Sequence, residues 1–200
     1  MNYTGPKVKL SRKIGINITP KSGKYASRKP YPPGQFGAQK RRAKQSDFGK
    51  QLLEKQRLRL QYNISEKQMR NYYDKASRML GNTADNLLTL METRLDSILF
   101  RSGIARSLYQ AKQLISHGHV KVNGKKVDIS SYQLRVNDII SLKDKSKNLQ
   151  DIQDNIRYTN PPAYIELSKA DLTAKLLYLP NTTEIPVQCE TSLVIEFYSR

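Results

Sequence analysis

The fold is decided by one stretch, residues 92–142, which reads ETRLDSILFRSGIARSLYQAKQLISHGHVKVNGKKVDISSYQLRVNDIISL. Its apolar side chains first recur at helical spacing, and Gly103 follows them as a residue that readily takes the left-handed conformation at a helix end. A second helix is predicted between the capping box of Ser107 and Gln110 and the terminating Gly118. Two short helices joined by a tight connection are therefore expected.

The periodicity then changes from helical to alternating, which is typical of strands. Residues 119–122 alternate polar and apolar side chains, and Asn123 and Gly124 suit a turn that needs positive φ. Residues 125–127 return as the partner strand, and residues 139–142 are predicted to add a third. The stretch is thus expected to form a compact α-β unit.

The polar side of this unit carries donors suited to phosphate and sugar oxygens. At about 100° per residue, Gln110, Gln113 and His117 fall within about 60° of one another, and Arg106 points the same way. We predict an RNA-binding surface formed by Arg94, Arg101, Arg106, Ser107, Gln110, Gln113, His117, His119, Lys121, Asn123, Lys125 and Lys126. The alternative is that these cations merely solvate the outside of a small domain, but they outnumber the acids of the same stretch.

The whole chain is strongly basic, with 35 Lys and Arg against 17 Asp and Glu and a net charge of +18. Such a charge predicts a polyanionic partner, and nucleic acid is favoured over a membrane because no apolar run is long enough to span one. Residues 1–50 carry 13 cations and one acid, whereas residues 151–200 carry four cations and seven acids. We therefore expect the first quarter to contact RNA and the last quarter to be free for protein contacts.

Longer motifs resemble a known family. Within residues 92–142, the segments ETRLD, QAKQLISHGHVKVNGKKV and SYQL resemble the RNA-binding domain named after small-subunit ribosomal protein four. That domain also occurs in other proteins, but the flanking sequence resembles the bacterial family of ribosomal protein four itself. The flanking motifs are YTGPK (3–7), YPPGQ (31–35), LEKQRLR (53–59), ISEKQ (64–68) and VIEFYSR (194–200). The resemblance covers essentially the whole chain.

We expect an α+β fold with a helical bundle domain, an α-β RNA-binding domain that has two helices on a small, mostly antiparallel sheet, and an extended basic arm. The expected divisions are the arm at 1–45, the helical domain at 46–91 completed by 187–200, and the α-β domain at 92–186. Further strands are expected at residues 164–167 and 175–179. Residues 193–198 are ambiguous between strand and helix by pattern, and the resemblance implies a helix.

The arm has few apolar side chains in any regular spacing, so we expect it not to fold alone. Its prolines and glycines would keep it extended along RNA, and a disordered solvated tail is the alternative. The predicted RNA contacts are Lys7, Lys9, Arg12, Lys13, Tyr31, Lys40, Arg41, Arg42 and Lys44. Many relatives carry zinc-binding cysteines here, but Val8 and Ser11 occupy the first two positions, so the resemblance implies a zinc-free form without cofactors.

Caps and apolar spacing predict helices through residues 46–91, beginning near residues 46–47, at the capping box of Ser65 and Gln68, and near Thr83. The side chains assigned to packing include Tyr72, Tyr73, Ala76, Met79 and Leu80. The cations predicted to contact RNA are Lys55, Arg57, Arg59 and Arg70. The resemblance implies a contact with ribosomal protein five, for which the candidates are Phe48, Gln51, Glu196, Phe197 and Tyr198.

No catalytic constellation is found in the sequence. His117 and His119 have no carboxylate or cysteine at ligand spacing, and a lone cysteine, Cys189, excludes an intrachain disulfide. The tripeptide RLD at residues 94–96 is similar to one around the catalytic Asp of pseudouridine synthases, but the rest of the chain does not resemble a synthase. We expect no enzyme, and an RNA-modifying activity is the least favoured alternative.

The resemblance implies a structural protein of the small ribosomal subunit that binds 16S rRNA at a helix junction of its 5′ domain and nucleates assembly of the subunit body. It further implies ribosomal proteins five and three as neighbours, a functional link with protein twelve in translational accuracy, and mRNA near its entry site. Repression of its own messenger is the alternative. The first residues lack an apolar signal region, so we expect a cytoplasmic location, with an organelle of bacterial origin as the alternative.

Overall fold

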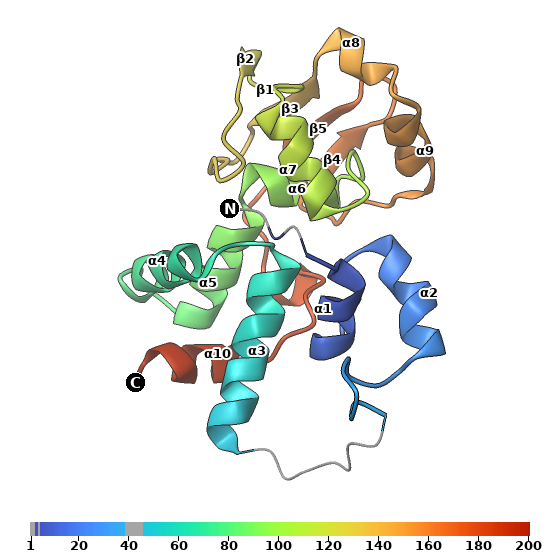
Figure 1. Cartoon of the computed structure of the whole chain (residues 1–200). Helices are drawn as coiled ribbons and strands as arrows, with labels where there is room; N and C mark the ends of the chain where they lie inside the picture. Colours follow the sequence, from blue (N-terminus) through green and yellow to red (C-terminus); the bar gives the residue numbers. More distant parts are fainter. Residues whose placement is uncertain (1–2, 4, 39–45) are drawn as a thin grey trace. The chain divides into compact units, whose positions relative to one another are not determined.

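The computed structural model describes residues 3, 5–38 and 46–200, which fall into two compact units. The helical unit lies within residues 1–84 and 187–200, and the α-β unit comprises residues 85–186 (Figure 1). The RNA contacts predicted at Lys40, Arg41, Arg42 and Lys44 lie outside the described residues.

The α-β unit is a sheet covered by helices. Its elements are α5 (Thr83–Glu92, which begins just before it), α6 (Leu95–Arg101), α7 (Leu108–Ser116), β1 (Val120–Val122), β2 (Lys125–Lys126), β3 (Ile139–Leu142), α8 (Asp144–Lys147), α9 (Gln150–Tyr158), β4 (Ile165–Ser168), β5 (Thr173–Leu176) and the 3-10 helix η1 (Thr182–Glu184). The strands pair antiparallel in the order β2-β1-β3-β5-β4. Side chains of α6, α7 and α9 share one buried apolar core with the sheet. The expected fold class is confirmed.

Local signals set the geometry of α7 and of the hairpin. Ser107 caps α7, since its Oγ accepts a hydrogen bond from Gln110 N at 3.3 Å. The side chain of Gln110 accepts from Arg106 N at 2.8 Å, one residue earlier than in the expected capping box. Asn123 and Gly124 have φ values of 48° and 79°, which close the predicted turn between β1 and β2.

The boundary between the units falls in the first turn of α5, between residues 84 and 85, whereas the sequence predicted it after residue 91. Hydrogen bonds tie this helix to the α-β unit along its length. Gln133 Nε2 donates to Leu90 O at 2.8 Å, and Thr89 Oγ1 donates to Pro180 O at 3.3 Å. These partners are distant in sequence and could not be identified from helical periodicity. The sequence-based boundary therefore placed α5 with the helical unit.

The helical unit is made from both ends of the chain. Its helices are α1 (Lys7–Ile14), α2 (Pro20–Arg28), α3 (Asp47–Gln61), α4 (Glu66–Ser77) and α10 (Thr191–Tyr198). Residues 193–198, which were ambiguous by pattern, are helical and lie beside α3 (Figure 1). Gln51 on α3 donates to Glu196 on α10 at 2.8 Å, and the Phe48 and Phe197 rings lie 5.7 Å apart.

The prediction of an extended arm is wrong for residues 7–14 and 20–28, which form α1 and α2. Hydroxyl groups hold the two helices together, because buried Ser11 donates to buried Ser22 at 2.9 Å and Thr19 bonds to Ser22 at 2.8 Å. Ile14 is the apolar anchor, being 1% exposed. Predictions from sequence periodicity depend on the spacing of apolar side chains. They therefore did not reveal that α1 and α2 are joined by serine and threonine hydroxyls.

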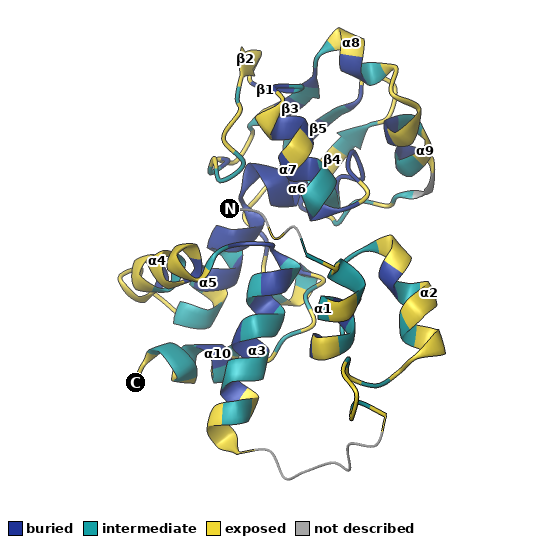
Figure 2. Cartoon of the chain, viewed as in Figure 1, coloured by how far each residue is buried: buried dark blue, intermediate teal, exposed yellow. Residues whose placement is uncertain are grey.

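The degree of burial differs strongly between elements. Figure 2 shows α6 almost entirely buried and the outer side of α4 exposed. The prediction that Met79 and Leu80 pack in a core is wrong, because α4 ends at Ser77 and leaves them 42% and 99% exposed.

Candidate RNA interface

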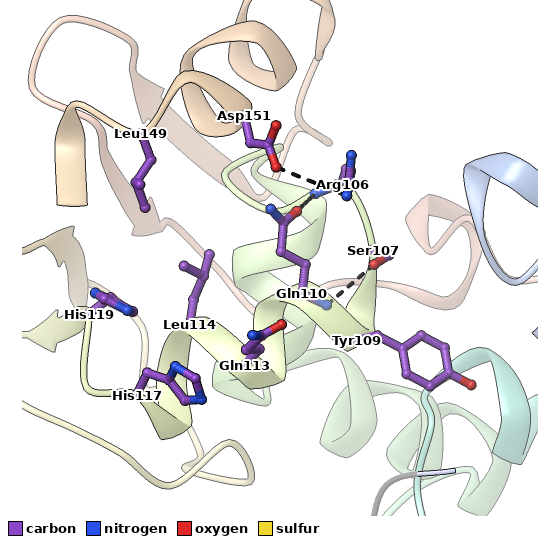
Figure 3. A pocket seen from close by; sticks show the side chains of 10 residues that line it. All are labelled: Arg106, Ser107, Tyr109, Gln110, Gln113, Leu114, His117, His119, Leu149 and Asp151. Atoms are coloured by element: carbon purple, nitrogen blue, oxygen red, sulfur yellow. Dashed lines mark hydrogen bonds and ion pairs between the residues drawn. The ribbon is translucent and has the colours of Figure 1, made fainter. Parts of the chain in front are cut away.

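A hollow of about 440 Å³ opens on the polar side of α7 (Figure 3). We call it the α7 hollow. Its lining residues are Arg106, Ser107, Tyr109, Gln110, Gln113, Leu114, His117, His119, Leu149 and Asp151. The structure therefore brings together the side chains of Arg106, Gln110, Gln113 and His117, which helical geometry placed on one face, and adds His119 to them.

The hollow is held in place by the packing of α7 beneath it. Ala111 and Ile115 are fully buried in the core on the opposite side of the helix, so Gln113 and His117 face outward. His119 is fixed separately, because its Nδ1 lies 2.8 Å from Ser146 Oγ. Most of the polar lining thus stands on well-packed elements.

Leu149 and Asp151 also line the hollow, although the sequence did not indicate either of them as a site residue. Asp151 lies in the first turn of α9, and one of its oxygens is 4.0 Å from Arg106 Nη2. Both side chains are more than half exposed, so this ion pair contributes little to stability. Only the fold brings α9 to α7, and no local signal in the sequence indicates it.

The hairpin beside the hollow carries the remaining cations. Lys121 on β1 and Lys126 on β2 are direct cross-strand partners, and Lys125 and Lys126 are exposed. Like charges placed opposite each other destabilise a strand pair. A bound polyanion would offset the repulsion between these two lysines. Asn123 is different, because its side chain donates to Asp138 at 2.8 Å and accepts from Ile139 N at 2.9 Å, which fixes the turn.

Arg94 was predicted to contact RNA, and the structure contradicts this. Its side chain is 1% exposed and forms a bidentate pair with Asp96, Nε to Oδ1 at 2.9 Å and Nη2 to Oδ2 at 2.7 Å. Lys112 Nζ lies 3.5 Å from the same carboxylate. Burial lowers the pKa of Lys112, as does the Arg94 charge, while Asp96 opposes the shift. Arg94 thus belongs to the core.

Two further predicted RNA contacts have structural roles. Arg101 forms an ion pair with the fully buried carboxylate of Glu92 and is itself only 15% exposed. Tyr164 donates to Glu92 at 2.8 Å, and burial together with this carboxylate raises the pKa of the phenol. Ser107 is buried as the cap of α7. The predictions for Arg101 and Ser107 did not anticipate this burial.

The cations of α3 connect the helices of the helical unit. Lys55 is 9% exposed, lies 2.9 Å from Glu66 on α4, and sits 4.7 Å above the Phe197 ring of α10. Arg59 reaches Glu66 at 3.5 Å. Because Lys55 is buried by these contacts, its prediction as an RNA contact is wrong.

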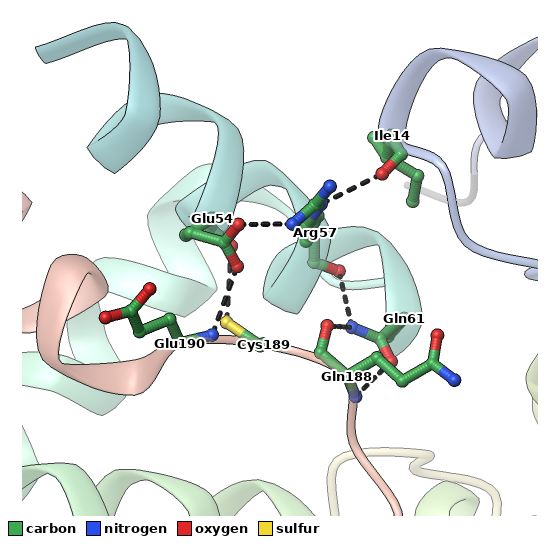
Figure 4. Close-up of polar contacts among 7 residues, drawn as sticks. All are labelled: Ile14, Glu54, Arg57, Gln61, Gln188, Cys189 and Glu190. Atoms are coloured by element: carbon green, nitrogen blue, oxygen red, sulfur yellow. Dashed lines mark hydrogen bonds and ion pairs between the residues drawn. The ribbon is translucent and has the colours of Figure 1, made fainter. Parts of the chain in front are cut away.

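Arg57 holds the first helix against α3 (Figure 4). Its Nε donates to Ile14 O at 2.9 Å, and its Nη1 pairs with Glu54. Glu54 also accepts from Glu190 N at 3.1 Å, and Cys189 lies 3.5 Å from Glu54 O. Burial and the Glu54 carboxylate raise the pKa of the Cys189 thiol to about 12.

Other cations predicted to contact RNA differ in accessibility. Arg70, Lys9 and Lys13 are exposed, and Lys7 is half-buried. Arg12 donates to Lys29 O at 3.1 Å and to Tyr31 O at 3.2 Å, with its guanidinium 5.1 Å from the Tyr31 ring. Arg12 and Tyr31 therefore bind each other.

The residues predicted to contact a neighbouring protein lie together where α3 meets α10. Gln51 is buried, and Tyr198 donates to Glu66 at 2.7 Å while stacking on Tyr73 at 5.1 Å. Phe48 remains 50% exposed, with the Arg200 guanidinium 6.0 Å from its ring. Phe48 is thus the most accessible apolar side chain of this group.

These features define a class of protein: a basic RNA-binding protein that presents a polar helix face and a cationic hairpin. A family model described as the S4 domain matches residues 93–140, and one described as the ribosomal protein S4/S9 N-terminal domain matches residues 2–92. The chain belongs to the family of small ribosomal subunit protein uS4. That family is structural and not enzymatic.

Relatives of this name are similar to the chain over nearly its whole length. The protein from Streptomyces griseus is 44% identical over 206 residues, covering 100% of this chain and 99% of its own. Those from Latilactobacillus sakei and Chlorobium phaeovibrioides are 45% and 44% identical, each covering 99% of this chain and 98% of its own. Among the described helices, none is long and apolar enough to cross a membrane.

Proposed function

We propose that this chain is a structural component of the small ribosomal subunit, which binds 16S rRNA through the α7 hollow and the β1–β2 hairpin. The observation that carries the proposal is the grouping of Arg106, Gln113 and His117 along α7 and at its two ends, beside the paired Lys121 and Lys126. Such fixed donors suit the phosphates and 2′-hydroxyls of a folded RNA.

The finer proposal is that the target is a helix junction in the 5′ domain of 16S rRNA, bound early, so that the protein nucleates the subunit body. The exposed cations of α1 and α2 support this proposal because they provide a second basic surface on another unit of the same chain. A junction offers several phosphate backbones at once, and a chain with two basic units suits such a target.

The test is binding of the purified protein to a 5′-domain rRNA fragment and to an unrelated folded RNA of the same length across a salt series. Selective binding should persist near about 200 mM salt, while the control RNA loses about 10³-fold or more in affinity. Equal binding of both RNAs at every salt concentration would contradict the proposal.

Variants locate the RNA on the protein. Arg106→Ala and Lys121→Ala should each weaken binding of the fragment by about 1–2 kcal/mol, typical of one lost charge-assisted hydrogen bond. Lys169→Ala, which removes an exposed lysine from the acidic last quarter of the chain, serves as the control. Unchanged affinity in both test variants would place the RNA on another face.

We further propose that ribosomal protein five docks near Phe48, and that through this contact the chain contributes to translational accuracy. The half-exposed Phe48 ring beside the mildly acidic last quarter of the chain supports this. Phe48→Ala should reduce recruitment of protein five to reconstituted subunits, whereas Phe36→Ala, which removes another exposed ring, should not. Equal recruitment with both variants would rule out the contact.

A further inference from the structure

We propose that the α7 hollow takes one unstacked guanine base of RNA, with Asp151 accepting hydrogen bonds from its Watson–Crick edge. The inference rests on the RNA-binding role proposed above and states which chemical group enters that site. Asp151 is an acid in a lining whose other polar side chains include the donors Arg106, Gln110 and Gln113.

The hollow has the size and lining of a small-ligand site. Its volume of about 440 Å³ lies within the usual range of about 300–1,000 Å³ for such pockets. Leu114 and Leu149 supply apolar surface, and Leu149 is 43% exposed although it is a large apolar side chain. A base has two apolar faces and a polar edge, and this lining offers a surface for each.

The mixture of polar groups favours a base over a phosphate. Arg106, Gln110 and Gln113 provide donors, as a phosphate site would require. Asp151 provides only acceptors when ionised and repels phosphate, so a site made for phosphate alone would be weakened by it. RNA-binding proteins read unstacked bases by hydrogen bonds to their edges, which need donors and acceptors together.

The direction of these groups selects guanine. Its Watson–Crick edge alone among the common bases carries two adjacent N–H donors, N1 and N2, which match the two oxygens of one carboxylate. The Gln110 oxygen is occupied by Arg106 N at 2.8 Å, and Figure 3 shows the amide nitrogen of Gln110 turned toward the hollow. That nitrogen is a donor suited to guanine O6.

Asp151 is available for this role because its ion pair with Arg106 is long and exposed to solvent. The Arg106 guanidinium is 4.0 Å away, and the two side chains are 59% and 62% exposed. When the carboxylate turns to the base, Arg106 is released and can bind the phosphate of the same or the next nucleotide. Both residues already line the hollow, so neither has to be brought there when RNA binds.

The experiment is an NMR titration of the full chain with GMP, IMP, AMP, CMP and UMP, following the side-chain amides of Gln110 and Gln113 and the imidazole of His117. We expect GMP to bind about fivefold or more tightly than AMP, CMP or UMP, with IMP in between because it lacks the N2 donor. Equal affinities, or shifts that leave these three side chains unchanged, would overturn the inference.

Asp151→Asn should abolish the preference for GMP, and Asp154→Asn is the matched control. Asp154 lies on the same helix outside the hollow lining, is exposed, and accepts from Gln150 at 3.2 Å. If Asp151→Asn instead strengthens all five nucleotides equally, Asp151 only repels phosphate and the inference fails. Thermal unfolding of both variants controls for the place of Asp151 in the first turn of α9.

Two comparisons complete the test. The first distinguishes a guanine within RNA from a free nucleotide, and the second distinguishes failure of this inference from failure of the proposed rRNA binding. The pentaribonucleotide UUGUU should bind more tightly than GMP, because its flanking phosphates can reach Arg106. It should also bind more tightly than UUAUU, because only guanine offers two donors to Asp151. Tighter binding of GMP than of UUGUU would indicate a site for free nucleotides and overturn the inference. Binding of the 5′-domain fragment is measured in parallel. If the fragment binds selectively while no guanine preference is found, only this inference fails.

Discussion

Two arginines show how differently side chains of one type can be placed by the fold. Arg94 and Arg106 look equivalent in the sequence, yet one is 1% exposed beside Asp96 and the other is 59% exposed at the α7 hollow. Composition fixes the number of cations but not which of them fold inward. The surface available to RNA is therefore smaller than the net charge suggests.

Removing one partner of the buried pair of Arg94 and Asp96 should strongly destabilise the α-β unit. Arg94→Ala leaves a fully buried carboxylate without its bidentate partner, and such a loss costs about 3–5 kcal/mol in the free energy of unfolding. Lys125→Ala, at an exposed cation of the same unit, is expected to change it by about 0.5 kcal/mol or less. Urea denaturation of the two variants makes the comparison, and similar midpoints would refute the structural role of Arg94.

Cys189 should be unreactive in the folded chain. The rise of its pKa from the usual 9.0 to about 12 lowers the thiolate fraction near pH 8 by about a thousandfold. We expect alkylation to be slow until denaturant releases the thiol, as followed by mass spectrometry over time. Fast labelling of the native protein would show that the segment around Cys189 separates readily from Glu54.

At the scale of elements, local signals were sufficient where one segment contains its own caps. The α7 helix and the β1–β2 hairpin follow from Ser107, Gly118 and the Asn123-Gly124 turn, each of which acts within a few residues. The site was predictable to the same extent, because Arg106, Gln110, Gln113 and His117 share one helix face. Asp151 and the Ser11–Ser22 contact depend on segments that meet only after folding, so the sequence alone did not indicate them.

Glu66 should make the packing of α3, α4 and α10 sensitive to acid. Partial burial would raise its pKa, but hydrogen bonds from Lys55 and Tyr198 and the nearby charges lower it below the usual 4.5. A lowered folded pKa means that the stabilisation is present in full above about pH 5 and is lost as the pH falls through the lowered value. We expect Glu66→Gln to flatten the pH dependence of stability between about pH 5 and 3, as measured by thermal unfolding across that range. A slope equal to that of the unsubstituted protein would contradict the role of Glu66.

At the scale of the whole molecule, the position of charge matters as well as its amount. Lys21→Gln with Lys24→Gln, on exposed α2, should lower the slope of log affinity against log salt for rRNA by about two. Arg157→Gln with Lys169→Gln removes the same charge from exposed sites in the acidic last quarter and should leave the slope unchanged. Equal effects of both pairs would mean that RNA senses only the net charge of +18.

The division of the helical unit between the two ends of the chain affects the order in which a newly made molecule can fold. Gln51 and Glu196 are 145 residues apart, so at about 5–20 residues per second α3 waits roughly 7–30 s for α10 to be synthesised. The α-β unit is continuous and is complete before that. During translation the RNA-reading unit can therefore be ready while the unit that encloses it in sequence is still open, and a nascent chain could engage rRNA before its own last helix has docked.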